Sequence, residues 1–366
     1  MIEKLNYPQI GLLILAWFVA DLAAPLIIRF AHAVGAVDRP RGYKIHREPV
    51  PFLGGIVIYV AFSIALFSIL RFENYRDHQD LFAIIFGGFF LLIVGAIDDF
   101  RPINAIVKLA ILIVVTYLLS RFGVIIRIFG NEVGDLALTL LWIAGVTSAM
   151  NSLDNMDGAS TGIAAIAAFF TFYVAWYSDQ PGVSYVAIAL LGACLGLLRY
   201  NFKPARIFLG DNGSFLLGFF LASMTVLAGW AKKDTVKAII VPCAILTVPL
   251  YDITLSTILR YKNGVVTSLK DAILYCGQDH LSHRLVALGL SQREAVLMLY
   301  LFATVGGAIG VLISSESVGP EIYAPVVALS FVVLFVVGIL LDRARVYDGS
   351  WKGETPTAIV GGGKHE

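Results

Sequence analysis

The chain has 366 residues, of which 58% are hydrophobic and 14% charged, and its mean hydropathy is +0.82. Soluble domains carry about 25% charged residues, so this composition excludes an ordinary soluble protein and predicts an all-α, polytopic membrane protein. The net charge of +1 and the lack of a basic tract give no reason to expect a nucleic-acid partner.

Eleven apolar stretches are candidates for membrane-spanning helices, although several are shorter than an ideal span of about 20 residues. They lie at about residues 9–30, 52–70, 81–97, 105–120, 135–150, 160–177, 184–199, 214–230, 237–259, 294–313 and 323–341. The sequence leaves no room for a separate soluble domain. We therefore expect one transmembrane domain over residues 1–350 and a disordered tail over residues 351–366.

Basic residues are distributed unevenly between the two sides of these spans. Nineteen of the 27 Lys and Arg residues lie in or next to the odd-numbered connections and the C-terminal tail. Because Lys and Arg mark the cytoplasmic side, we expect the odd connections and the C-terminus to be cytoplasmic and the N-terminus to lie outside. Each cluster of polar residues in the sequence then falls on the cytoplasmic face, whereas a transporter more often places such residues near mid-membrane.

The first odd connection contains Lys44 and His46 and ends at Gly54-Gly55. Its basic residues fit either a phosphate-binding loop or an ordinary positive-inside anchor. The next cluster is Asp98-Asp99, which ends the third span and is followed by Lys108. Adjacent helical side chains point about 100° apart, so the two carboxylates cannot serve the same face. A solvated helix end and a snorkelling lysine are the alternatives here.

The third and fourth clusters follow the fifth and seventh spans. Asn151, Asp154 and Asp157 recur at every third residue without a basic neighbour, which favours a cation or a donor-rich ligand over a hydrated turn. Asn201 and Asp211 belong to the next connection. An acid such as Asp211 at a helix start is stabilised by the helix dipole alone, and a metal-binding carboxylate is the functional alternative.

The last cluster combines His280, His283 and Arg284 in the connection that precedes the tenth span. Two imidazoles without a nearby thiolate make a poor zinc site. Two His with an Arg are better suited to a diphosphate, although a polar surface is the simpler alternative. Upstream, Asp252 lies inside the ninth span, where an acid is by default a functional candidate.

Together these groups suit a Mg²⁺–diphosphate substrate, because magnesium takes one or two protein oxygens and leaves the rest to phosphates and water. The lipid surroundings suggest that a second substrate is itself bound to the membrane.

Five motifs in this order resemble the polyprenyl-phosphate N-acetylhexosamine-1-phosphate transferases, a family of integral membrane enzymes. The motifs are His46 with Pro51-Phe-Leu-Gly-Gly55, Ile97-Asp-Asp-Phe100 with Lys108, Asn151-x-x-Asp154-x-x-Asp157-Gly158, Asn201-Phe with Ile207-Phe-Leu-Gly-Asp211-Asn-Gly-Ser214, and Asp279-His280-x-x-His283-Arg284. The resemblance spans roughly residues 38 to 285. It implies a catalytic domain with its active site on the cytoplasmic face of the inner membrane.

The resemblance also implies the reaction and the roles of these residues. N-acetylhexosamine 1-phosphate, with GlcNAc 1-phosphate as the favoured group, would pass from a UDP-sugar to undecaprenyl phosphate, with release of UMP. Mg²⁺ is the implied cofactor, with Mn²⁺ as an alternative, and a homodimer is an open expectation. The implied metal ligands are Asp211 and Asn151. The implied catalytic residues are Asp98, Asp99, Asp211 and Lys108. The implied substrate-binding residues are Lys44, His46, Asn151, Asp154, Asp157, Asn201, His280, His283 and Arg284.

Two departures from the family pattern bear on specificity. Ser282 stands where many members carry a histidine, and Ser148 stands where many carry an asparagine. The peptidoglycan branch of the family has a different histidine-rich loop, so the resemblance favours UDP-N-acetylglucosamine or a related N-acetylhexosamine over UDP-MurNAc-pentapeptide. A transferase of the phospho-MurNAc-pentapeptide type and a nucleotide-sugar or lipid-linked-sugar transporter remain as alternatives. One-step transfer and a covalent aspartyl intermediate are both open mechanisms.

Overall fold

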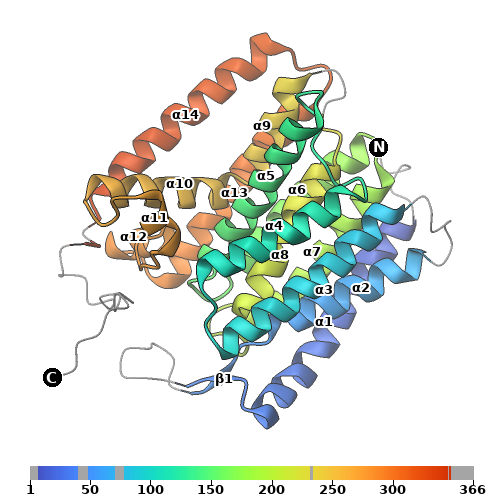
Figure 1. Ribbon diagram of the computed structural model, residues 1–366, viewed down its shortest axis with the longest axis vertical. Coiled ribbons are helices and arrows are strands. Elements are labelled where there is room, and N and C mark those ends of the chain that lie inside the picture. Colours follow the sequence, from blue (N-terminus) through green and yellow to red (C-terminus); the bar gives the residue numbers. More distant parts are fainter. Residues whose placement is uncertain (1–6, 40–47, 71–77, 231–233, 345, 348–366) are drawn as a thin grey trace.

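The computed structural model describes residues 7–39, 48–70, 78–230, 234–344 and 346–347, and these form a bundle of helices (Figure 1). Lys44, His46 and the tail from residue 351 lie outside the described residues. The sheet found among the described residues is a two-stranded antiparallel ladder of β1 (Val37–Asp38) and β2 (Val50–Pro51). The prediction of an all-α membrane fold is confirmed.

The helices follow the predicted apolar stretches closely. Their bounds are α1 (Tyr7–Val34), α2 (Gly54–Leu70), α3 (Gln79–Phe100), α4 (Ala105–Ser120), α5 (Glu132–Ser152), α6 (Ala159–Tyr177), α7 (Pro181–Asn201), α8 (Gly210–Leu227), α9 (Thr235–Ile245), α10 (Thr247–Lys262), α11 (Leu269–Leu274), α12 (Leu281–Ala287), α13 (Gln292–Ser314) and α14 (Pro320–Asp342). Among the described residues, seven helices are long and apolar enough to cross a bilayer. The number of candidate spans becomes eight if α9 and α10 form one span. The predicted number of eleven spans is therefore not confirmed, and α2 and α4 are shorter apolar helices.

The ninth predicted span is not a straight helix, because α9 and α10 meet at an angle of 82°. Pro249 has no N–H to donate to the carbonyl of Ile245, four residues earlier. The first helix ends at Ile245, one turn before this proline. Asp252 therefore lies on a separate helix, which turns toward the connection that contains α11 and α12 (Figure 1).

Helix α8 lies at the centre of the bundle and packs against α2, α3, α5 and α6. Glycines allow the closest of these contacts. A Cβ on Gly95 of α3 would lie 2.5 Å from the Cα of Asn212, and a Cβ on Gly218 of α8 would lie 2.6 Å from the Cα of Thr147 in α5. Backbones this close require glycine. The contact at Gly95 brings the C-terminal end of α3 against the start of α8.

The outer helices expose apolar side chains. Helix α14 is the least buried of the long apolar helices, with Leu329, Phe331 and Phe335 largely exposed. Within the bundle, α14 is tied to α10 by a hydrogen bond from the Tyr251 hydroxyl to the Leu334 carbonyl. Apolar surface of this extent on a helical bundle is expected to face lipid.

Candidate active site

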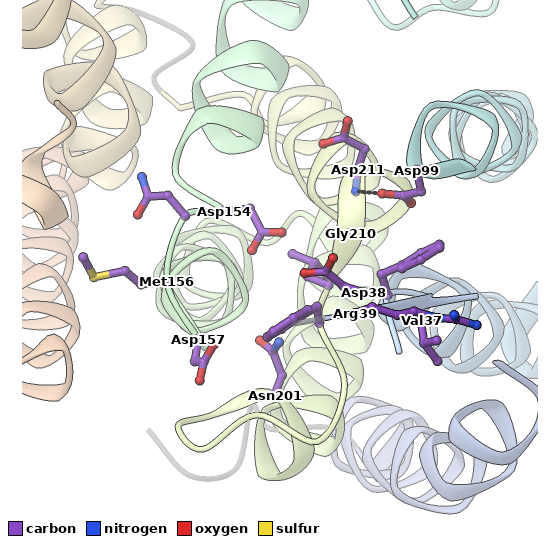
Figure 2. A pocket seen from close by; sticks show the side chains of 14 residues that line it. Val37, Asp38, Arg39, Asp99, Asp154, Met156, Asp157, Asn201, Gly210 and Asp211 are labelled. Atoms are coloured by element: carbon purple, nitrogen blue, oxygen red, sulfur yellow. Dashed lines mark hydrogen bonds between the residues drawn. The ribbon is translucent and has the colours of Figure 1, made fainter. Parts of the chain in front are cut away.

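A cavity of about 620 Å³ opens at one end of the bundle (Figure 2). Its walls come from β1 and the residues that follow β1 and β2, the C-terminal ends of α3 and α7, the loop between α5 and α6, and the start of α8 with the two residues before it. The lining residues are Val37, Asp38, Arg39, Phe52, Asp99, Asp154, Asn155, Met156, Asp157, Asn201, Phe208, Leu209, Gly210 and Asp211. The structure thus brings residues of the second, third and fourth motifs around one space that is rich in carboxylates.

Asp99 accepts hydrogen bonds from the first turn of α8. Its Oδ1 accepts from the Asp211 backbone N at 2.7 Å, and its Oδ2 accepts from the Asn212 backbone N at 3.1 Å and from Asn212 Nδ2 at 2.6 Å. The preceding residue, Leu209, has no side chain that could cap this helix. Asp99 therefore caps α8 from a neighbouring helix, and a carboxylate is favoured there by the free N–H groups and the dipole.

Asp98 points away from its neighbour, as the angle between adjacent helical side chains requires. Its carboxylate accepts from Lys108 Nζ and from the backbone N of Ile103, each at 2.5 Å. Lys108 Nζ also lies 3.6 Å from Oδ2 of Asp211. Lys108 is therefore held between two carboxylates, and with 18% of its side chain exposed it does not extend into solvent as a snorkelling lysine would. Asp98 does not line the cavity.

Asp211 is oriented by Asn151. The Asn151 Nδ2 donates to Asp211 Oδ1 and to Ser214 Oγ, both at 2.8 Å. In this arrangement the amide nitrogen of Asn151 supports the carboxylate. An amide oxygen can bind a hard cation, so the role of Asn151 as a metal ligand stays a prediction. About a third of the Asp211 side chain (36%) remains exposed at the cavity.

The donor set at this position fits one magnesium ion held jointly with a substrate. No group of three or more His, Cys, Asp or Glu side chains with metal-binding geometry occurs among the described residues. A cage made entirely of protein ligands is therefore absent from this part of the chain. Magnesium, however, commonly takes one or two carboxylates and completes its shell with phosphates and water. Asp211 offers such a carboxylate.

Asp154 and Asp157 belong to the short loop between α5 and α6. Burial raises the pKa of Asp154 well above its ordinary value, and the nearby charges of Asp211 and Asp99 raise it further. Asp157 Oδ2 accepts from the backbone N of Ala205 at 3.1 Å, which joins this loop to the one before α8. A crowded carboxyl such as Asp154 is stabilised by a cation or by a ligand with hydrogen-bond donors.

Asn201 is buried and joins α6 to the loop that precedes α8. Its Oδ1 accepts from the Thr161 hydroxyl at 2.8 Å, and its Nδ2 donates to the Ile207 carbonyl at 2.9 Å. Both ends of the amide are therefore engaged within the protein. This geometry gives Asn201 a role in shaping the wall of the cavity, and its predicted contact with substrate stays a prediction.

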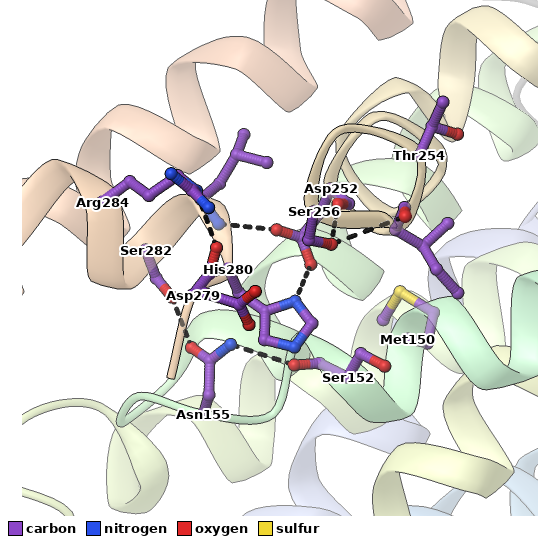
Figure 3. Close-up of polar contacts among 12 residues, drawn as sticks. Met150, Ser152, Asn155, Asp252, Thr254, Ser256, Asp279, His280, Ser282 and Arg284 are labelled. Atoms are coloured by element: carbon purple, nitrogen blue, oxygen red, sulfur yellow. Dashed lines mark hydrogen bonds and ion pairs between the residues drawn. The ribbon is translucent and has the colours of Figure 1, made fainter. Parts of the chain in front are cut away.

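The fifth motif forms a separate buried network beside α10 (Figure 3). Asp279 binds the Arg260 guanidinium through both carboxylate oxygens, at 2.7 and 2.6 Å. Nδ1 of His280 lies 2.7 Å from Asp252 Oδ2. Arg284 is 1% exposed and donates to the Asp279 carbonyl and the Tyr347 hydroxyl, both at 2.8 Å.

The charges in this network follow from burial and pairing. Burial alone lowers the pKa of His280, but the charge of Asp252 and their hydrogen bond outweigh it and raise the pKa above 6.5. Burial, aided by the charge of His280, lowers the pKa of His283 to about 4. His283 is therefore neutral at pH 7.

The structure does not bring His280, His283 and Arg284 to the cavity, since none of them lines it. The prediction that they grip a diphosphate directly finds no support in this placement. The engaged Arg284 would have to change partners first. One hydrogen bond does reach the cavity from this region, from Ser282 Oγ to Oδ1 of the cavity residue Asn155 at 2.6 Å.

Five residues of the cavity wall are neither predicted site residues nor named positions of the motifs, namely Val37, Asp38, Arg39, Asn155 and Met156. Asn155 and Met156 lie inside the third motif but off its three-residue period, so the pattern that selected Asp154 and Asp157 passed over them. Val37 and Asp38 form β1 within the first connection and pair with Pro51 and Val50 of β2, and Arg39 follows β1. A pairing of two-residue strands leaves no readable pattern in a sequence.

The chain is similar to known proteins over most of its length. Residues 81–229 match the family described as Glycosyl transferase family 4. A decaprenyl-phosphate N-acetylglucosaminephosphotransferase of Mycolicibacterium smegmatis is 30% identical over 373 residues, which cover 92% of this chain and 88% of the relative. The chain belongs to the polyprenyl-phosphate N-acetylhexosamine-1-phosphate transferase family.

Two further relatives cover most of the chain. A probable undecaprenyl-phosphate N-acetylglucosaminyl 1-phosphate transferase of Bacillus subtilis is 29% identical over 342 residues, 90% of this chain and 92% of the relative. An undecaprenyl-phosphate α-N-acetylglucosaminyl 1-phosphate transferase of Escherichia coli is 26% identical over 336 residues, 86% of each. The segment that matches the family runs from α3 to the end of α8. Most residues that line the cavity of this chain therefore lie within the matched segment, whereas α10, α12 and α13 lie beyond it.

Proposed function

We propose that this protein transfers N-acetylglucosamine 1-phosphate from UDP-N-acetylglucosamine to undecaprenyl phosphate and releases UMP. The observation that carries the proposal is the convergence of Asp99, Asp154, Asp157 and Asp211 on one cavity at one end of a membrane bundle. The named activities of the relatives support the choice of sugar and of a polyprenyl acceptor.

The proposed reaction is a direct displacement at phosphorus. An oxygen of the lipid phosphate forms a bond to the β-phosphorus of the donor. The bond from that phosphorus to the bridging oxygen breaks, and the bridging oxygen leaves on UMP. The second pKa of a phosphate monoester is about 6, so the lipid phosphate is mostly dianionic at neutral pH and needs no strong base.

The residues of the cavity would then act mainly by position and charge. Asp211 would hold Mg²⁺, which when bound neutralises charge on the diphosphate. Lys108 does not line the cavity, but its ammonium group, held between Asp98 and Asp211, would place positive charge beside the metal-binding carboxylate. Asp99 keeps the start of α8 in place. The catalytic role that the resemblance implies for Asp98 stays a prediction.

The orientation in the membrane is part of the proposal. The cavity lies at the end of the bundle where α1 finishes and β1 begins, and the first described residues lie at the other end of α1 (Figure 1). Together with the distribution of Lys and Arg, this supports a cavity that opens to the cytoplasm in the inner membrane, with the N-terminus outside. A homodimer stays a prediction.

The test uses purified protein in detergent with undecaprenyl phosphate and a panel of UDP-sugars that includes UDP-GlcNAc and UDP-MurNAc-pentapeptide. We expect UMP release and a lipid-linked GlcNAc 1-phosphate product, identified by mass, with UDP-GlcNAc. Chelation of divalent cations should abolish turnover, and Mg²⁺ or Mn²⁺ should restore it. If no donor released UMP, the proposed transferase activity would be refuted and the transporter alternative would be favoured.

A variant pair tests the metal-binding carboxylate. Asp211→Asn should lower turnover by a factor on the order of 10², the loss typical when one main electrostatic group of an active site is removed. Asp21→Asn is the matched control, because Asp21 forms an ion pair with the exposed Arg199, and exposed pairs contribute little. Equal turnover of the two variants would exclude Asp211 from the metal site.

A further inference from the structure

The loop that joins α5 to α6 forms one wall of the cavity, and it is held by residues from the far end of the chain. This acidic loop comprises residues 153–158, and its Asp154, Asn155, Met156 and Asp157 all line the cavity. The negative charges of Asp211, Asp99 and Asp157 all destabilise the ionised form of the Asp154 carboxyl group. Because like charges repel, the loop needs other contacts to keep its carboxylates facing inward.

The first of these contacts comes from α12. Ser282 is fully buried, and its hydroxyl donates to Asn155 Oδ1 at 2.6 Å, while Asn155 Nδ2 donates to the Ser152 carbonyl at 2.9 Å (Figure 3). The Asn155 amide is thereby fixed at both ends. The start of α12 is itself anchored, because the backbone N of Leu281 donates to Asp252 Oδ1 at 2.6 Å.

The second contact comes from α13. The Tyr300 hydroxyl donates to the Gly158 carbonyl at 2.6 Å, at the opposite end of the acidic loop. The ring fits a notch that exists only because Gly162 has no side chain, since a Cβ there would lie 2.0 Å from the Tyr300 hydroxyl oxygen. Gly158 has a φ of +78°, a left-handed conformation that suits glycine.

We propose that Ser282 and Tyr300 are positioning residues, which hold the acidic loop from its two sides so that Asp154 and Asp157 face the donor substrate. The idea rests on the proposed function for the identity of that donor. Both residues lie outside the segment that matches the family. In this chain, then, the wall of the cavity depends on side chains that α12 and α13 supply.

The first experiment measures the loop without any substrate. Hydrogen–deuterium exchange of a peptide covering residues 151–160 is compared among the wild type, Ser282→Ala, Tyr300→Phe and the double variant. We expect faster exchange in each single variant and the fastest in the double variant, because the loop opens locally more often. Unchanged exchange in the double variant would overturn the proposal.

The second experiment separates positioning from catalysis. Each single variant should raise the KM for UDP-GlcNAc by about fivefold, the size expected for one net hydrogen bond, with kcat little changed. Two control variants lose similar bonds far from the loop. Tyr59→Phe removes a 3.2 Å bond to the Ile85 carbonyl, and Ser314→Ala removes one to the Val311 carbonyl. Equal KM values in control and test variants, or faster exchange without a change in KM, would contradict a positioning role.

A double-mutant cycle tests the Ser282 contact itself. If the hydroxyl acts through Asn155, Ser282→Ala combined with Asn155→Ala should raise KM no more than Asn155→Ala alone. Ser282→Thr should restore most of the affinity because it keeps the hydroxyl. Additive effects would show that the two residues act separately. A wild type without donor turnover would refute the proposed function, and the exchange measurement would still decide whether the two contacts hold the loop.

Discussion

Replacement of Asp99 by asparagine tests whether this acid is a structural cap or a reacting group. In the structure its two oxygens accept three hydrogen bonds from the first turn of α8. Asparagine keeps one oxygen and turns an NH₂ group toward at least one of these donors. In either orientation of the amide, one or two of the bonds are lost and a donor faces a donor.

The size of the effect follows from these contacts. A hydrogen bond to a charged group contributes about 1.5–3 kcal/mol, so Asp99→Asn should lower the free energy of unfolding by at least that amount. Asp154→Asn is the matched control in the same cavity. The described residues offer the Asp154 carboxylate no side-chain hydrogen bond, and neighbouring charges repel it. The control should therefore leave stability unchanged or raise it.

The assay is the temperature at which half of the detergent-solubilised protein stays monodisperse, measured without substrate and without divalent cations. We expect the midpoint temperature of Asp99→Asn to lie below that of the wild type. The midpoint of Asp154→Asn should equal or exceed that of the wild type. Equal midpoints for the two variants would refute the capping argument. Asp99 would then be free to act as the covalent nucleophile that the sequence left open.

Two other changes test the packing and the buried network. Gly95→Ala puts a Cβ 2.5 Å from the backbone of Asn212 and should cost about 1–3 kcal/mol in stability, whereas Gly145→Ala enters open space and should cost nothing in the same thermal assay. His280 has a raised pKa, so its pairing with Asp252 stabilises the fold below pH 6.5 and is lost as the pH rises through the folded-state pKa. His280→Gln should therefore lower the midpoint more at pH 6 than at pH 9, and an equal loss at both would contradict a charged His280.

Much of the bundle could be predicted from the sequence because the apolar stretches report directly on the membrane. Each predicted span coincides with a helix or, at residues 237–259, with a bent pair. The convergence of the second, third and fourth motifs also followed from their alternate placement along the chain. What hydropathy could not give was the break at Pro249, since both halves of the pair are apolar.

The roles of single side chains were harder to predict because they depend on contacts between distant segments. The sequence paired Asp98 with Asp99 as catalytic groups, whereas the structure gives one to Lys108 and the other to α8. It grouped His280 and Arg284 with the substrate, whereas buried partners such as Asp252 and Tyr347 engage them. In each case the deciding partner lies tens of residues away or in another helix, and no local period encodes it.

The start of α8 explains why carboxylates gather at this point of a membrane protein. Its free N–H groups need acceptors, and Leu209 supplies none, so Asp99 of α3 is drawn to them while Gly95 and Gly210 let the backbones meet. Asp211 follows in the first turn, where the helix dipole favours an acid. The interaction that assembles the bundle here thus also concentrates negative charge at the cavity. An anionic diphosphate is repelled from such a space, and this repulsion supports our proposal that a divalent cation accompanies the donor substrate.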